Sequence, residues 1–126
     1  MKTIIFSVFF FVLIYTSVFS QEKTVKVEID FGNDKEIISK KVSKEQSITA
    51  LEALQLAATV ETHAVGSYVF VTSINNIKAN YGKTAWYYKV NGESSKVLAI
   101  NNNLKDGDVL RWILKEDVCS KTVDKD

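Results

Sequence analysis

Hydrophobic and polar residues alternate in the stretch KTVKVEIDF, residues 23–31. The apolar side chains recur at every second position: Val25, Val27, Ile29 and Phe31. A period of two is typical of a strand with one buried face. The segment Gly32–Asp34 has turn chemistry, and residues 36–42 have the composition of a second strand. The pattern therefore predicts an antiparallel hairpin at the start of the folded domain.

A helical pattern follows this hairpin. Thr49 and Glu52 have the spacing of a capping box, in which the threonine hydroxyl accepts a hydrogen bond from the Glu52 amide and the glutamate reaches back. At about 100° per residue, the next apolar residues share one broad face. They are Ala50, Leu51, Ala53, Leu54, Ala57, Ala58 and Val60. We expect the helix to end near residues 60–63, before Gly66.

Further strands are predicted downstream of the helix, each bounded by turn signals. These strands cover residues 67–74, 84–90, 97–100 and 109–114. The turn signals between them are Asn75-Asn76, Asn80–Lys83, Asn91-Gly92 and Lys105–Asp108. The order of elements predicts an α+β fold with a β-grasp-like mixed sheet packed on a single helix.

The first twenty residues have a different composition. Lys2 precedes an apolar run from Ile4 to Tyr15, and the segment ends at Ser20 after small side chains. This arrangement is typical of a cleaved export signal. The run is shorter than the about 20 apolar residues that span a bilayer as a helix, but an uncleaved anchor is the alternative interpretation. We expect a signal peptide over residues 1–20, one domain over 21–116, a polar tail over 117–126, and delivery to the periplasm or outside the cell.

Charge and cysteine content narrow the classes of partner. Removing residues 1–20 removes one of the 16 basic residues, so 15 basic and 15 acidic residues remain. A neutral chain without a basic stripe argues against nucleic acid and against an anionic membrane surface after signal cleavage. The single cysteine, Cys119, has no partner within the chain for a disulfide, so packing must hold the fold.

The order of several motifs resembles a known family. They are ITALEALQLAA on the predicted helix, GSYVFVTSINNIKAN, AWYYKVNGE and LKDGDVLRWIL. Together these motifs resemble the C-terminal β-domain of the cobalamin carriers transcobalamin and intrinsic factor, and the related DUF4430 family. Two features depart from the family pattern. Asn75-Asn76 stands where Asn-Gly is usual, and Ser73 and Lys78 replace the cysteine pair of the carriers.

This resemblance implies an exported binding module for a small ligand, with cobalamin or a related corrinoid as the candidate and no required cofactor. In the carriers a second, helical domain holds the other face of the corrin. The resemblance therefore implies a half-site that another protein chain completes. Only the favourable contact free energy that exceeds the costs of association and desolvation contributes to affinity, so such a half-site alone should bind weakly.

Aromatic and amide side chains are the candidate ligand-binding residues. We select His63, Tyr68, Asn75, Asn76, Asn80, Tyr81, Trp86 and Tyr87. Alternation places Trp86 and Tyr88 on one face of their strand and Tyr87 on the other. Trp86 is interpreted as a core residue together with Trp112, and the alternative places it at a ligand-binding rim. The asparagines offer donors and acceptors to an amide-bordered corrin, or they only form turns.

No catalytic arrangement is visible in the sequence, and we predict that the protein is not an enzyme. His63 is the only histidine, so a zinc site would need its other three ligands from carboxylates, and no spacing suggests one. No Ser/His/Asp or Cys/His order points to a catalytic triad, because Cys119 lies in the polar tail. We expect His63 near the helix end, in a structural or solvated role. Asp106 and Asp108 have the spacing of a turn, with weak calcium binding as the alternative. The alternative function is a protein-interaction module that pairs through a sheet edge, with no small ligand.

Overall fold

The computed structural model describes residues 22–33 and 35–117. The predicted signal peptide, Cys119 and most of the predicted polar tail lie outside the described residues. The domain boundaries and the export signal therefore stay predictions.

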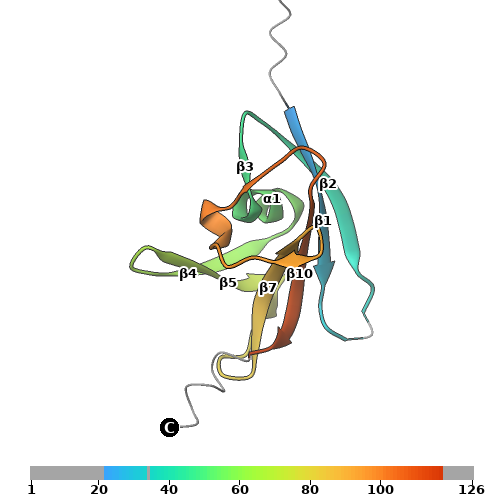
Figure 1. Cartoon of the computed structure of the whole chain (residues 1–126). Coiled ribbons are helices and arrows are strands. Elements are labelled where there is room, and N and C mark those ends of the chain that lie inside the picture. The colour runs from blue at the N-terminus through green and yellow to red at the C-terminus, as the bar shows by residue number, and fades with distance from the viewer. Residues whose placement is uncertain (1–21, 34, 118–126) are drawn as a thin grey trace, which may run out of the picture.

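The largest sheet is mixed and has five strands. Its order is β2 (Ile38–Glu45), β1 (Glu22–Asp30), β10 (Val109–Glu116), β7 (Thr84–Val90) and β8 (Glu93–Ser94). Strands β1 and β10 run parallel, and the other neighbours are antiparallel. Figure 1 shows these strands along one side of the molecule. The predicted first hairpin is confirmed, and its second strand begins two residues later than the sequence indicated.

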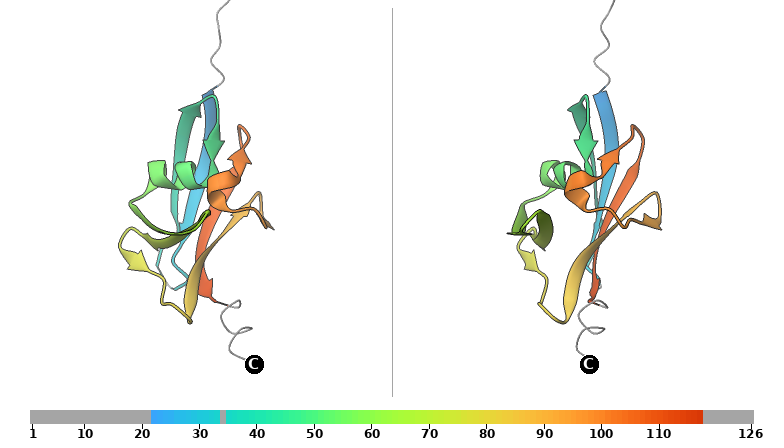
Figure 2. Two further views of the ribbon diagram at one scale, coloured as in Figure 1. Left: turned by 90° about the vertical axis from the view of Figure 1, so that its left-hand side faces the viewer. Right: turned by 60° about the vertical axis from the view of Figure 1, so that its left-hand side comes forward.

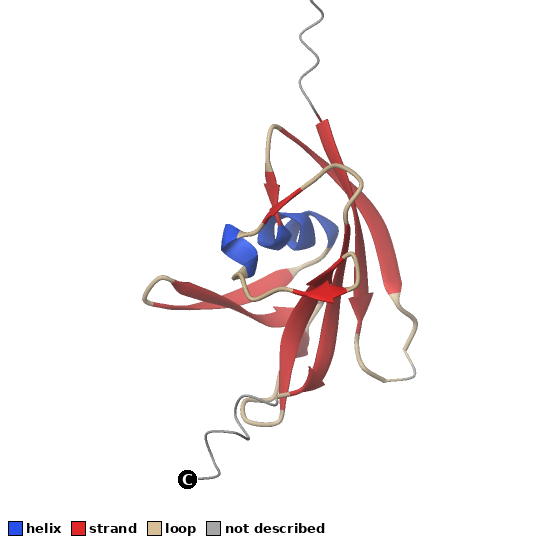
Figure 3. Cartoon of the chain, viewed as in Figure 1, coloured by secondary structure: helices blue, strands red, loops and turns tan. Residues whose placement is uncertain are grey.

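The helix α1 (Ala50–Ala57) lies between the large sheet and two smaller ones. One is the three-stranded sheet of β4 (Val60–Val65), β5 (Tyr68–Ile74) and β6 (Ile77–Lys78), and the other pairs β3 (Ile48–Thr49) with β9 (Asn103–Leu104). Figure 3 shows α1 surrounded by strands, and Figure 2 shows the hairpin of β4 and β5 from two further sides. The mixed sheet with one α-helix fits the predicted α+β class.

The core forms between α1 and the inner face of the large sheet. Leu51, Leu54 and three alanines of α1 are buried against the apolar residues of β1 and β10. The three alanines allow the helix to approach the sheet closely because their side chains are small. Trp86 and Trp112 extend this core, as the sequence analysis favoured.

The helix begins as predicted but ends earlier. The capping box is present, with the Glu52 N–H donating to Thr49 Oγ1 at 3.1 Å and the Thr49 N–H to Glu52 Oε1 at 3.2 Å. The helix ends at Ala57, and the next six-residue element is the strand β4. Expecting the helix to reach residues 60–63 was wrong because the pairing of β4 with β5 outweighs the helical spacing of the apolar residues.

A second correction concerns residues 97–100, which do not form a strand. The segment is a loop that leads into a short 3₁₀ helix, η1 (Ala99–Asn101). Ala99 is buried and Val97 is exposed, so the apolar residues anchor the loop at one point only. Side-chain composition alone did not distinguish this anchored loop from a short strand.

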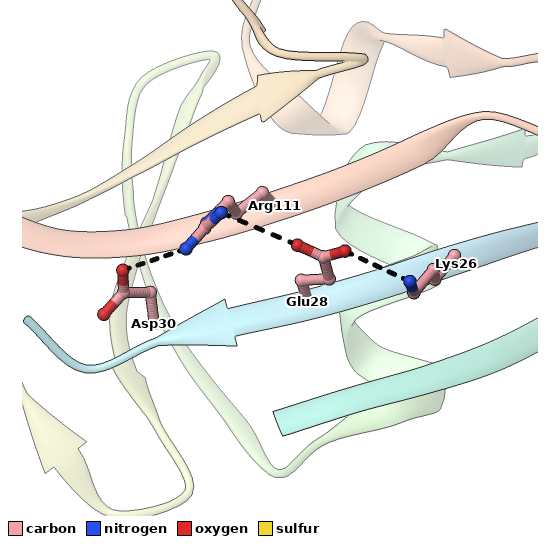
Figure 4. A network of polar contacts seen from close by, with 4 residues as sticks. All are labelled: Lys26, Glu28, Asp30 and Arg111. Carbon is pink, nitrogen blue, oxygen red and sulfur yellow. Dashed lines mark hydrogen bonds and ion pairs between the residues drawn. The ribbon is translucent and has the colours of Figure 1, made fainter. Parts of the chain in front are cut away.

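A polar network covers the outer face of the large sheet, opposite α1 (Figure 4). Arg111 of β10 lies 3.2 Å from Asp30 and 3.8 Å from Glu28 of β1, and Lys26 lies 3.4 Å from Glu28. The four side chains are partly exposed, so each ion pair contributes little to stability. The ion pairs connect β1 with β10 and favour the observed register of these two parallel strands.

The capping box gives a testable stability prediction. We expect Thr49→Ala to lower the free energy of unfolding by about 1 kcal/mol, because the Glu52 amide loses its acceptor. Urea unfolding monitored by circular dichroism measures the change. Thr49→Ser keeps the hydroxyl and should restore most of the loss. If both variants lose the same amount, the methyl group of Thr49 rather than the cap stabilises this end of the helix.

Candidate functional site

An open cleft of about 830 Å³ lies beside the large sheet. The hairpin of β4 and β5 lines one side, and β7 with part of β10 lines another. The segment 94–99 contributes a third wall. The cleft therefore lies where the two sheets diverge, and most of the side chains that line it are apolar or aromatic.

Strand β7 presents an open backbone edge beside this cleft. The Asn91 N–H donates to the Val109 carbonyl at 2.8 Å, which fixes the odd-numbered residues of β7 as those that bond to β10. The N–H and C=O groups of Trp86 and Tyr88 therefore point to the opposite edge. Strand β8 pairs only with Lys89 and Val90, so it does not cover that edge along Trp86 and Tyr88.

Side-chain hydrogen bonds hold the third wall in place. The Tyr88 hydroxyl donates to the Val97 carbonyl and accepts from Asn102 Nδ2 at 3.2 Å. The same Asn102 amide group also donates to Ser95 Oγ at 3.2 Å. Tyr88 therefore joins β7 to the segment 94–99, and the cleft has a fixed floor and wall.

Apolar side chains remain exposed around the cleft opening. Phe70 is 48% exposed, Tyr81 is 100% exposed, and Val65 and Val97 are about half exposed. Tyr68 stacks on Phe70 with ring centroids 6.2 Å apart and an interplanar angle of 10°. Exposed apolar residues that gather at one place mark surfaces that contact a ligand or a partner. We call Val65, Phe70, Tyr81 and Val97 the apolar rim.

Four of the residues selected from the sequence line this cleft: His63, Tyr81, Trp86 and Tyr87. His63 was expected near the helix end, and that placement was wrong because it lies within β4. Its side chain is exposed, which fits the expected solvated role. Trp86 is only 7% exposed, and its indole N–H donates to the Ile77 carbonyl at 3.2 Å. Its ring also meets Phe31 edge-on, with centroids 5.8 Å apart. Trp86 is therefore a core residue that borders the cleft.

Tyr87 lies on the outer face of β7, as alternation predicted. Its hydroxyl donates to Asp117 at 3.2 Å, and the Lys115 ammonium lies 4.7 Å from the ring centroid. These contacts place Tyr87 at the far margin of the cleft, toward the end of the sheet at which β7 begins and β10 ends.

The other four selected residues do not line the cleft. Tyr68 is next to the rim through its stack on Phe70. Asn75 and Asn76 form the turn between β5 and β6 with positive φ angles of 49° and 67°, and Asn75 Oδ1 accepts from the Thr59 N–H. Asn80 accepts backbone hydrogen bonds from the next turn. The structure thus gives the asparagines turn roles.

Most of the apolar lining of the cleft was not among the residues selected from the sequence. Val69, Phe70 and Val71 of β5 and Leu98 of the 94–99 segment contribute to the cleft. The only available signal was the density of large apolar side chains in SYVFV, which a buried strand also has. Their exposure depends on the hairpin projecting from the body, a tertiary feature that local sequence patterns do not reveal.

The described residues contain no group of three or more His, Cys, Asp and Glu side chains that could hold a metal ion. Asp106 Oδ1 accepts from the Thr24 N–H, and Asp108 accepts from the Lys105 N–H and from Asn91. Both carboxylates therefore hold turns together. Between residues 22 and 117, Asp34 aside, no helix is long and apolar enough to cross a membrane.

Solved structures with a similar fold include the following two. One is a protein from Ruminococcus gnavus ATCC 29149 described as a candidate metal-binding protein, with a TM-score of 0.66 and 20% identity over 75% of this chain and 98% of that chain. The other is haptocorrin in complex with Cbi, with a TM-score of 0.63 and 16% identity over 79% of this chain. The match spans 26% of haptocorrin, about a quarter of its length. At these identities the likeness shows the fold alone.

No curated protein matches the chain in sequence. The family model for the domain of unknown function DUF4430 matches residues 47–116, which is more than half of the chain and includes α1, the β4–β5 hairpin and the cleft strands. The resemblance inferred from the sequence motifs is therefore confirmed, and this chain belongs to the DUF4430 family.

Proposed function

We propose that this domain is an exported module that binds a flat small molecule in the cleft between the β4–β5 hairpin and β7. The observation that carries the proposal is the cleft itself. Its volume of about 830 Å³ lies within the range of about 300–1,000 Å³ typical of ligand sites. The apolar rim adds exposed surface that a bound molecule would remove from water.

Cobalamin or a related corrinoid is the leading ligand class. The fold is similar to that of haptocorrin, which was solved in complex with Cbi. The open edge of β7 supports an amide-bearing ligand, because the Trp86 and Tyr88 backbones offer both donors and acceptors there. Binding without catalysis is part of this proposal. The proposal also includes a β-grasp arrangement of the domain and cleavage of a signal peptide before it acts.

We infer that the cleft is a half-site. The chain corresponds to about a quarter of haptocorrin, and an open cleft leaves part of a corrin-sized ligand in water. Contacts on one face must offset the whole entropy cost of association, so the isolated domain should bind weakly. A second chain or domain that covers the opposite face would raise the affinity.

The open edge of β7 also favours the alternative function, in which an extended peptide adds a strand to the sheet. Residues 84–88 contain neither proline nor lysine, the residues that commonly prevent such pairing. Absorbance titration with cobalamin at high protein concentration separates the two functions. A spectral shift that saturates supports the corrinoid site, and its absence leaves strand addition as the better proposal.

Phe70→Ala tests the position of the site. Because the Phe70 ring is about half exposed, covering it by a ligand should contribute about 1 kcal/mol, and its loss should weaken binding about fivefold. Leu56→Ala is the matched control, since Leu56 is 55% exposed on α1 and does not line the cleft. Equilibrium dialysis with cobalamin compares the variants. Equal weakening by both would mean that the ligand adheres to apolar surface in general, and the cleft assignment would fail.

A further inference from the structure

Strand β4 forms a second open edge, on the side of the hairpin away from β5. Residues 61–65 are all exposed, and in the three-stranded sheet β4 pairs only with β5. We propose that this edge pairs with β4 of a second copy of the chain, antiparallel and centred on Thr62. The proposal goes beyond ligand binding and does not depend on it.

The hydrogen-bond direction along β4 supports this pairing. The Thr59 carbonyl accepts from the Asn75 N–H, and the Glu61 carbonyl accepts from the Thr72 hydroxyl, so these odd-numbered residues face β5. The pairing shifts register between Glu61 and Thr62, but the extra residue, Thr72, lies in β5, so the alternation along β4 continues through Val65. The N–H and C=O groups of Val60, Thr62 and Ala64 therefore point away from β5. Three successive outward residues provide a ladder long enough for a short strand pair.

Three of the longer strand edges, those of β2, β7 and β4, differ in how they resist pairing. Strand β2, the outer strand of the large sheet, has the sequence ISKKVSKE with three lysines, which repel a second copy. The edge of β7 borders the cleft and is partly covered by β8. Strand β4 has the sequence VETHAV, without lysine, proline or glycine. Of these three edges, that of β4 has neither a lysine nor a covering strand, and its one irregularity is the register shift between Glu61 and Thr62.

Charge complementarity selects the register. With Thr62 opposite its own equivalent, Glu61 of each copy lies opposite His63 of the other, which gives two equivalent pairs. The imidazole donates a hydrogen bond to the carboxylate, and a positive charge on the ring adds attraction. A shift that places Glu61 opposite its own equivalent brings two carboxylates together and is disfavoured.

The same register joins the two exposed aromatic faces. His63 lies opposite Phe70, and Val65 lies opposite Tyr68, within each hairpin. Pairing at Thr62 would place Glu61 of the second copy beside His63 on the same face of the extended sheet. The Tyr68–Phe70 stacks of both copies would then border one six-stranded surface. His63 and Val65 also line the cleft, so the interface would lie next to the ligand site of each copy.

Sedimentation of residues 21–126 over a concentration series tests the pairing. Such a short strand pair buries a small area, so we expect a weak dimer that becomes evident at concentrations on the order of 1 mM. Thr62→Pro removes the central donor at a position that faces away from β5, so the fold should persist while the dimer is lost. Circular dichroism and thermal unfolding verify the fold of each variant.

A charge exchange tests the register. Glu61→His and His63→Glu place like side chains opposite each other, and each should weaken the dimer about tenfold, since two equivalent cross-strand pairs change. The double variant restores both pairs in exchanged positions and should return to wild-type association. A monomer at every concentration, or a dimer that Thr62→Pro leaves intact, would overturn the proposal. A double variant no stronger than either single variant would overturn the register.

Discussion

Replacing Leu54 by alanine is expected to lower the free energy of unfolding by about 2–5 kcal/mol. Leu54 is fully buried on the inner face of α1, between the helix and the large sheet. The loss combines the transfer free energy of the removed methyl groups with the cost of the cavity they leave. Because small domains have total stabilities of about 5–15 kcal/mol, this single change could unfold much of the population at elevated temperature.

Leu56 provides a matched control for Leu54 on the same helix. It is 55% exposed, so Leu56→Ala removes the same atoms from an environment that is already largely water. We expect Leu56→Ala to change the free energy of unfolding by less than about 0.5 kcal/mol. Chemical denaturation of both variants measures the difference. Similar losses at the two positions would mean that helix propensity, rather than packing against the sheet, controls the stability of α1.

The elements with strong local signals were predicted correctly from the sequence. When one face of a sheet is buried, alternation places Val25, Val27 and Ile29 together on that face. The structure buries all three side chains. Asn91-Gly92 forms the predicted turn with positive φ angles of 51° and 83°, a backbone conformation that these two residue types favour. In both cases the determining interactions lie within a few residues in the sequence.

The elements that depend on distant partners were less predictable. Val60 fits the apolar face of an extended helix, yet it pairs with Ile74 in a strand. The pairing with β5 decides the outcome, because it gives the residues of β4 backbone partners along their whole length, from Val60 opposite Ile74 to Val65 opposite Tyr68. Residues 97–100 show the opposite case, since their strand-like composition finds no neighbouring strand and forms a loop and a 3₁₀ turn.

The candidate site was identified only in part. Trp86 and Tyr87 were selected for their aromatic character, and both border the cleft. Phe70 was not selected, although it forms much of the rim, because its exposure follows from the projection of the hairpin. Asn75 was selected for its amide, which instead accepts from the Thr59 backbone. Residue chemistry therefore indicated the region, and the tertiary arrangement determined which side chains face the cleft.

Gly32 has the most restrictive backbone environment among the glycines. It follows β1 with a φ of +76°, and its N–H donates to Asp30 Oδ1 at 2.9 Å. A Cβ atom at this position would lie 2.2 Å from the Leu114 carbonyl oxygen, far inside van der Waals contact. The obstacle is backbone of β10, which is held between β1 and β7 and cannot move without disturbing both pairs.

We therefore expect Gly32→Ala to lower the free energy of unfolding by about 2–5 kcal/mol, from left-handed backbone strain and from displacement of a packed strand. Gly92→Ala isolates the first cause, because Gly92 has a φ of +83° and open space around its Cβ position. Gly92→Ala should lower the free energy of unfolding by about 1–2 kcal/mol. Urea unfolding gives both values, and equal losses would show that β10 yields to the added methyl group. A larger loss at Gly32 would show that this turn holds the parallel strands β1 and β10 in contact, and that the large sheet which forms one side of the cleft depends on it.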